Sequence, residues 1–153
     1  MALRGTAVRR REDDPLLRGT STFVADISLL NAAQVYYLTS TVAHADIISI
    51  NVDDAKNAPG VIDVVTHADL DIGPYPAANP IFDEAMVRPL LANGRVRFVG
   101  EPVVAIIAES AALAQDAAEL VDIRYEPLDA IIDPEAALDS SIILFNDTAE
   151  GNV

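Results

Sequence analysis

The sequence predicts an α+β fold in which a mixed sheet carries a few helices packed on one side. Segments with strand and helix patterns follow one another without strict alternation, and no internal repeat is present. Hydrophobic side chains make up 51% of the 153 residues, enough for one core without disulfides or metals. We therefore expect a charged segment at 1–20, a single domain at 21–140 and a tail at 141–153.

The first strands follow a polar opening, with order expected to begin near Thr22–Asp26. Residues 33–40 are predicted as a strand from their run of Val, Tyr, Tyr and Leu. Residues 46–52 are predicted as a second strand, paired with the first. Its core face is expected to carry the apolar residues spaced by two, which are Ile48, Ile50 and Val52.

A strand, helix, strand unit continues the domain. Asp53 suits the N-cap of one helical turn over 54–58, and Pro59-Gly60 ends that turn before a strand at 61–65. Thr66 is expected to cap another brief turn through Leu70. Glycines and prolines between 73 and 89 predict a long irregular connection.

Order is expected to return at 95–99 and at 103–108, with a bend or bulge at Gly100. The near-continuous apolar run of 103–108 indicates a strand covered on both faces. Ser110 is the predicted cap of a helix at 111–120. The core stripe of that helix is expected to comprise Leu113, Ala114, Ala117, Leu120 and Val121.

A strand at 121–125 is predicted to end before Pro127, because proline cannot donate to a sheet ladder. Asp133-Pro134 then favours a helical turn through Leu138, with proline in the first turn. The residues from Ser140 onward lack the pattern of a regular element.

Composition excludes several classes of function. The net charge of −14 disfavours a nucleic-acid binder, since phosphate repels such a surface. The absence of cysteine excludes thiolate zinc sites, cysteine nucleophiles and cysteine-held iron–sulfur clusters from this segment. Neither a signal-peptide core nor an 18-residue apolar span is present. We expect a cytoplasmic protein without membrane contact.

The N-terminal segment is electrostatically distinct from the remainder. Five of the ten basic residues precede Gly19, namely Arg4, Arg9, Arg10, Arg11 and Arg18. A basic head of this kind suits an arm that docks on an acidic partner, or a targeting segment. A solvated or disordered terminus is the more economical interpretation.

The residues alone assign no catalytic, cofactor-binding or metal-binding position. The acidic pairs Asp13-Asp14, Asp53-Asp54 and Asp83-Glu84 are adjacent, and adjacent residues point in different directions on regular elements. His44 and Asp46 share a strand face if the strand begins early, but a metal site needs further ligands. His67 is expected to be a surface or cap residue. Dinucleotide-binding, P-loop and nucleophile-elbow motifs are absent.

An ordered series of short motifs resembles the opening of the large subunits of xanthine dehydrogenase, aldehyde oxidase and carbon monoxide dehydrogenase. Each motif alone is weakly specific, and their shared order over nearly the whole chain carries the resemblance. The motifs comprise residues 11–19 and 23–27, Ala43-His44-Ala45, Ala58-Pro59-Gly60-Val61, residues 96–103, Ala108-Glu109-Ser110, residues 114–121, and Tyr125-Glu126-Pro127-Leu128.

The resemblance implies an amino-terminal α/β-hammerhead domain at 21–140, with 141–153 as the junction to a molybdopterin-binding region that this sequence lacks. Members of this family use molybdopterin, FAD and iron–sulfur clusters on other regions or subunits, so no catalytic residue is carried over. Two departures stand out: Thr39-Ser40-Thr41 replaces a common Arg-Ser-Pro, and Asp46 stands where arginine is common. Contacts made by those arginines are therefore not expected here.

The expected function is that of a structural accessory domain, either a fragment or a small separate subunit, of a molybdenum hydroxylase. Its partners are the molybdopterin-binding region, the FAD and iron–sulfur subunits and, for the isolated chain, a second copy in a homodimer. One alternative is a free-standing interaction module that keeps the hammerhead fold, slightly favoured by Thr39-Ser40-Thr41. Another is an acid/base enzyme using His44 or His67, which lack identifiable partners.

Overall fold

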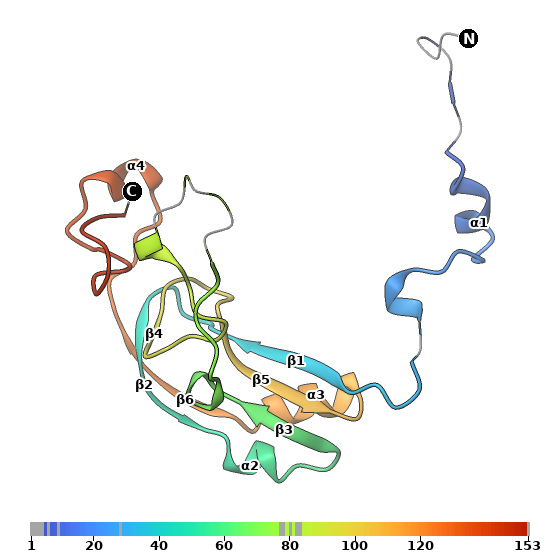
Figure 1. The fold of residues 1–153 in the computed structure, drawn as a ribbon, viewed down its shortest axis with the longest axis horizontal. Helices are drawn as coiled ribbons and strands as arrows, with labels where there is room; N and C mark the ends of the chain where they lie inside the picture. Colours follow the sequence, from blue (N-terminus) through green and yellow to red (C-terminus); the bar gives the residue numbers. More distant parts are fainter. Residues whose placement is uncertain are drawn as a thin grey trace. The chain divides into compact units, whose positions relative to one another are not determined.

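The computed structural model describes residues 5, 7–8, 10–27, 29–76, 79, 81 and 84–152 (Figure 1). The chain forms two compact units, Met1–Ala32 and Ala33–Val153. Of the basic residues in the N-terminal segment, Arg4 and Arg9 lie outside the described residues.

The first unit is ordered by local hydrogen bonds around the short helix α1 (Asp13–Leu17) and the 3-10 turn η1 (Val24–Asp26). In α1, Arg18 Nε donates to Asp14 Oδ1 at 2.8 Å. At η1, the backbone N–H of Phe23 donates to Asp26 Oδ2 at 2.9 Å. Regular structure therefore begins earlier than the expected start near Thr22. None of the residues described between 5 and 32 is buried.

In the described part of the second unit, six strands form two three-stranded sheets. Sheet A has the order β1-β5-β3, formed by Gln34–Thr39, Pro102–Ala108 and Val61–Val65. Sheet B has the order β4-β2-β6, formed by Arg95–Val96, Ala45–Asn51 and Asp122–Pro127. All of the strand pairings in these sheets are antiparallel.

The α+β fold class is confirmed, but two antiparallel sheets replace the single mixed sheet that the sequence predicted. The reason is that consecutive strands always belong to different sheets, so every connection crosses from one layer to the other. The expected pairing of 33–40 with 46–52 is therefore wrong. Strand β1 pairs with β5, while β2 pairs with β4 and β6.

Strand β2 also differs from the predicted alternation. A bulge between Ile47 and Ser49 shifts the register against β6 and places the core face on Ile47 and Ile50. Ile48, which strict alternation assigned to the core, is 48% exposed. An extra residue in one strand has this effect because the side-chain period of a strand is two.

The helices of the second unit are short. They are α2 (Asp53–Lys56), η2 (His67–Asp69), η3 (Glu84–Met86), α3 (Ala111–Ala118) and α4 (Pro134–Leu138). Ser110 caps α3 as predicted, accepting from the backbone N–H of Leu113 at 3.3 Å. Asp133 likewise caps α4. Asp53 is instead the first helical residue of α2, whose N-cap is Val52.

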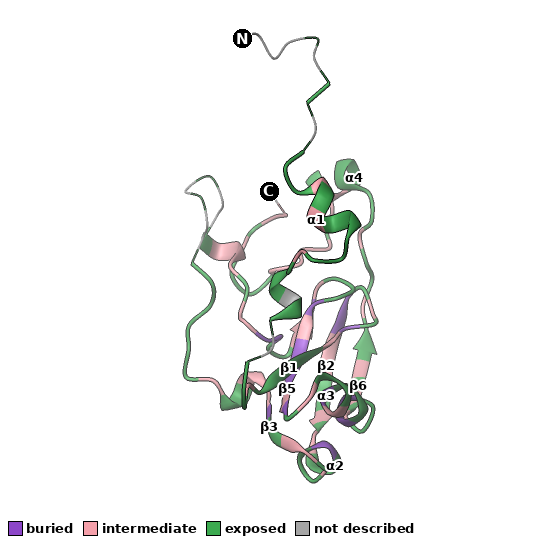
Figure 2. Ribbon diagram, turned by 90° about the vertical axis from the view of Figure 1, so that its right-hand side faces the viewer, coloured by how far each residue is buried: buried purple, intermediate pink, exposed green. Residues whose placement is uncertain are grey.

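The core lies around β5 and is covered by α3. Helix α3 packs on β1 and β5 through the buried alanines Ala114, Ala117 and Ala118. Leu120 lies beyond the end of α3 and is exposed, so its place in the predicted stripe is wrong. Among the strands, burial is concentrated in β5, which is buried along most of its length as its apolar run predicted (Figure 2). None of the helices in the described parts has the length and apolar character needed to cross a membrane.

Candidate functional site

One face of sheet A carries apolar side chains that the helices do not cover. The register places Val35 opposite Ile107 and Tyr37 opposite Ala105, on the central and edge strands. Alternate residues of β5, such as Ile106, are fully buried in the core with Ala114 of α3. Because successive strand residues point to opposite faces, Val35, Tyr37 and Ile107 lie on the face away from α3.

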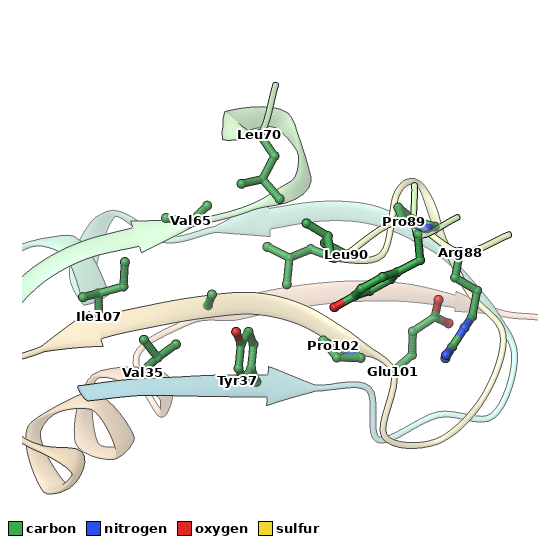
Figure 3. Close-up of a pocket in the computed structure, with 13 residues that line it drawn as sticks. Val35, Tyr37, Val65, Leu70, Arg88, Pro89, Leu90, Glu101, Pro102 and Ile107 are labelled. Carbon is green, nitrogen blue, oxygen red and sulfur yellow. The ribbon is translucent and has the colours of Figure 1, made fainter. Parts of the chain in front are cut away.

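Two segments of the connection between β3 and β4, at 70–75 and 88–91, line a groove of about 600 Å3 on this face together with the strands (Figure 3). We call it the sheet A groove. A backbone hydrogen bond from Tyr75 N to Arg88 O at 2.9 Å joins these two segments. The sheet contributes Val35, Tyr37, Val65 and Ile107, and the connection contributes Leu70, Tyr75, Pro89 and Leu90. Tyr37 remains 55% exposed.

Polar groups line one end of the sheet A groove. The guanidinium of Arg88 lies 5.1 Å from the centre of the Phe98 ring, a cation–π arrangement. Glu101 is only 3% exposed, and its Oε2 accepts from the backbone N–H of Arg97 at 2.6 Å. Its Oε1 is buried and has no hydrogen-bond partner among the described residues. The remaining walls suit apolar contact with another protein surface.

A second polar cluster joins sheet B to the C-terminal segment. Asp46 on β2 accepts from Arg95 Nε of β4 at 2.6 Å, and this bond lowers the pKa of the Asp46 carboxyl. Arg97 Nε donates to the carbonyl of Leu144 at 2.8 Å. These contacts link strands to the tail, and the sequence reasoning missed them because their partners are remote along the chain.

His44 is buried immediately before β2 and is not paired with Asp46. Its Nδ1 lies 2.7 Å from the carbonyl oxygen of Asp129, so the ring donates there. Its Nε2 is buried without a hydrogen-bond partner in the described parts. Asp46 is bound to Arg95 instead. Among the described residues, no three His, Cys, Asp or Glu side chains gather as metal ligands would.

The other residues singled out from the sequence lie apart from one another. His67 begins η2 and is half-buried, with its Nδ1 unpaired among the described residues. Asp69 in the same turn accepts from both Thr66 N and Thr66 Oγ1, which lowers the pKa of Asp69. Asp53-Asp54 lie in the first turn of α2. In the pair Asp83-Glu84, Asp83 lies outside the described residues and Glu84 begins η3.

The sequence offered only a partial signal for the sheet A groove. Val35 and Tyr37 alternate within one strand, and Ile107 interrupts the buried run of β5 at the same face. Such alternation predicts a face, but the partner strand and the covering loop are set by tertiary pairing. The sheet A groove therefore cannot be predicted from the sequence pattern alone.

Known proteins similar to this chain are large molybdenum hydroxylase subunits. Residues 18–129 match the family model described as "Aldehyde oxidase and xanthine dehydrogenase, a/b hammerhead domain". The 6-hydroxypseudooxynicotine dehydrogenase complex subunit gamma of Paenarthrobacter nicotinovorans is 41% identical over 148 residues, covering 92% of this chain and 19% of that protein. The carbon monoxide dehydrogenase large chain of Afipia carboxidovorans is 33% identical over 141 residues, covering 88% of this chain and 16% of that protein.

A solved structure shows the same arrangement. Quinoline 2-oxidoreductase from Pseudomonas putida 86 superposes with a TM-score of 0.80 at 42% identity, covering 96% of this chain and 19% of that chain. The chain thus spans 16% to 19% of the length of these relatives. The family match covers more than half of the chain, including every strand of the described residues. The chain therefore belongs to the a/b hammerhead domain family of aldehyde oxidase and xanthine dehydrogenase.

Proposed function

We propose that this chain is a structural accessory domain of a molybdenum hydroxylase large subunit. The observation that carries the proposal is the sheet A groove, an apolar surface left open on a domain that matches only 19% of the length of its relatives. A surface of this kind suits contact with the much longer remainder of such a subunit.

The partner of the sheet A groove, in this proposal, is the molybdopterin-binding region. Molybdopterin, FAD and iron–sulfur clusters would be held by that region and by further subunits, and the assembly would work in the cytoplasm. The domain itself would extend over 21–140, with 141–153 leading toward the cofactor region. Its contribution is to pack and to shape the approach to the cofactor, without supplying a catalytic group.

Metal analysis and an activity assay test the catalytic side of the proposal. The purified chain should contain no stoichiometric molybdenum and should not oxidise an aldehyde or a purine with a dye acceptor. Aldehyde oxidoreductase from Desulfovibrio gigas and xanthine dehydrogenase from Emericella nidulans, purified in parallel, serve as the positive controls for the two substrates. Stoichiometric molybdopterin, or turnover by the isolated chain, would contradict the role of an accessory domain.

A binding experiment tests the sheet A groove directly. The probe is the quinoline 2-oxidoreductase large chain from Pseudomonas putida 86 without the segment that matches this chain. We expect the two to associate, and Tyr37→Ser to weaken the association because it removes an exposed aromatic ring from the groove. Ile62→Ser is the matched control, since Ile62 is exposed on β3 but does not line the groove. Equal binding by both variants would exclude the groove as the contact.

The alternative of a free-standing interaction module rested on Thr39-Ser40-Thr41. Ser40 is buried, and its hydroxyl donates to Val42 O at 2.7 Å and accepts from Val42 N at 3.1 Å. Ser40 thus has an internal role in the turn after β1. It is also the residue that this segment shares with Arg-Ser-Pro, so only Thr39 and Thr41 still support the alternative. Neighbouring DNA without any cofactor-domain coding sequence would nevertheless favour the free-standing module.

A further inference from the structure

The aspartate that replaces a common arginine takes part in a link between sheet B and the C-terminal segment. The antiparallel register places Asp46 of β2 directly opposite Arg95 of β4, where cross-strand side chains meet. Asp46 Oδ1 accepts from Arg95 Nε at 2.6 Å. The same guanidinium donates through Nη1 to Asn146 Oδ1 at 2.7 Å. One planar group therefore bridges β2 and the C-terminal segment, and fixing its Nε orients its other nitrogens.

Arg97 holds the same segment from the neighbouring position. Its side chain is 8% exposed, its Nε donates to Leu144 O at 2.8 Å, and its guanidinium lies 4.6 Å from the centre of the Phe145 ring. A more distant contact of 3.9 Å joins it to Asp147. Arg95 and Arg97 together thus contact four consecutive residues of the C-terminal segment, 144–147.

The C-terminal segment depends on such contacts because residues 141–152 contain no helix or strand. Asn152 folds back on it, accepting from Leu144 N at 3.0 Å and donating to Ile142 O at 2.8 Å. The backbone N–H groups of Thr148 and Ala149 both donate to Phe145 O. Figure 1 shows this segment (red) turning back near α4 before the chain terminus. Side chains, rather than a regular backbone ladder, fix its path.

We propose that Asp46 is a positioning residue which, through Arg95 and Asn146, holds residues 141–152 in one orientation on sheet B. The positioning role of Asp46 does not depend on the proposed function. Its effect in a large subunit does rest on that function, because there the segment would lead toward the cofactor region. A fixed segment would present that region at a defined angle to the domain. An isoelectronic change at Asp46 that removes its charge should loosen the segment without unfolding the domain.

Residue-resolved amide hydrogen exchange on the full chain tests the proposal. For Asp46→Asn, we expect the amides of Leu144, Thr148 and Ala149 to exchange roughly threefold to tenfold faster, as suits the loss of one partly exposed ion pair. Asp46→Arg should give at least as large an effect, because it places like charges opposite one another. Asp122→Asn, on β6 of the same sheet and exposed, controls for the change in net charge.

A double-mutant cycle separates positioning from simple loss of stability. Asn146→Ala should speed exchange of the segment by itself, and should add little in the Asp46→Asn background if both act through Arg95. The amide of Ile47, which donates to Gly94 O at 2.8 Å, reports on the β2–β4 edge in the same spectra. We expect its exchange to change less than that of the segment.

Three results would overturn the inference: unchanged segment exchange in Asp46→Asn, fully additive effects of the two substitutions, or equal acceleration at Ile47. The experiment requires no partner and no cofactor. It can therefore fail while the sheet A groove still binds a large-subunit remainder, and it can succeed if that binding is absent.

Discussion

The carboxylate of Glu101 accepts a hydrogen bond from the backbone N–H of Arg97, four residues earlier, at 2.6 Å. This contact closes the turn that carries the chain from β4 of sheet B to β5 of sheet A. The turn is further fixed by Ser40, whose backbone N–H donates to Glu101 O and whose carbonyl accepts from Gly100 N, both at 2.8 Å. A buried carboxylate thus organises the junction between the two sheets.

Glu101→Ala should lower the free energy of unfolding by about 1–3 kcal/mol, because the N–H of Arg97 loses a charge-assisted acceptor. Chemical denaturation with a spectroscopic readout measures the change. Glu119→Ala, at an exposed position after α3, should change stability by less than about 0.5 kcal/mol. Similar effects for the two variants would show that the turn does not depend on the buried carboxylate.

Gly60→Ala should cost about 1–2 kcal/mol, since Gly60 has a φ of +74°, a conformation that alanine adopts reluctantly. A Cβ at this position would also lie 2.5 Å from Leu113 Cδ1, so the leucine would have to move. Thermal or urea unfolding would measure the loss. Gly73→Ala is the matched control, because a Cβ there meets open space. A stable Gly60→Ala variant would contradict the requirement for glycine in the turn immediately before β3.

The contribution of Asp46 should depend on pH in the acid range. Its hydrogen bond from Arg95 lowers its pKa in the folded state, so the ion pair stabilises fully above the unfolded value of about 4 and is lost as pH falls through the lower folded value. The side chain is 37% exposed, which limits the contribution to under about 1 kcal/mol. Urea unfolding at several pH values should show wild type and Asp46→Asn converging at low pH. A constant difference would be inconsistent with the ion pair.

Ala117→Leu should destabilise the domain by about 1–3 kcal/mol or more, because Ala117 is 1% exposed where α3 packs on sheet A. Ala112→Leu adds the same atoms to an exposed position on the same helix and should be nearly neutral. Comparing their unfolding midpoints isolates the packing cost. If both substitutions were tolerated equally, α3 would not pack closely on the strands.

The isolated chain should self-associate at high concentration through the sheet A groove, because its apolar face is uncovered. Val35→Asp should shift the equilibrium toward monomer by adding charge to that face, whereas Ile62→Asp outside the groove should not. Sedimentation equilibrium over a wide concentration range measures the effect. A wild-type chain that stays monomeric throughout would refute the prediction.

Local elements were largely predictable from the sequence, because their causes lie within a few residues. The apolar run of β5 predicted a strand that is buried along most of its length, and Ser110 and Asp133 predicted two helix starts. Strand pairing was not predictable in this way. The partner of β1 is β5, and only tertiary packing selects it from the other apolar segments. The bulge after Ile47 likewise overrode the regular alternation.

The candidate site was less predictable from the sequence than the fold was. The sheet A groove is lined by Val35 and Ile107, which lie far apart in the sequence. The contact with the C-terminal segment likewise links Asp46 to Asn146 through hydrogen bonds from Arg95. Neither combination forms a contiguous motif. The sequence did mark Asp46 as a departure from the family pattern, but its ion-pair partner became evident only from the register of β2 against β4.

The alternation of consecutive strands between the two sheets has a kinetic consequence. Because the strands described at 34–127 form no hairpin, each pairing must close a long loop, as when Ala45 meets Pro127 or Gln34 meets Ala108. Loop-closure entropy then delays the first stable contacts, and folding is expected to be slow for a domain of this size. Neither sheet is complete until β5 and β6 have joined, so a chain emerging from the ribosome would gain its native pairings late and nearly together.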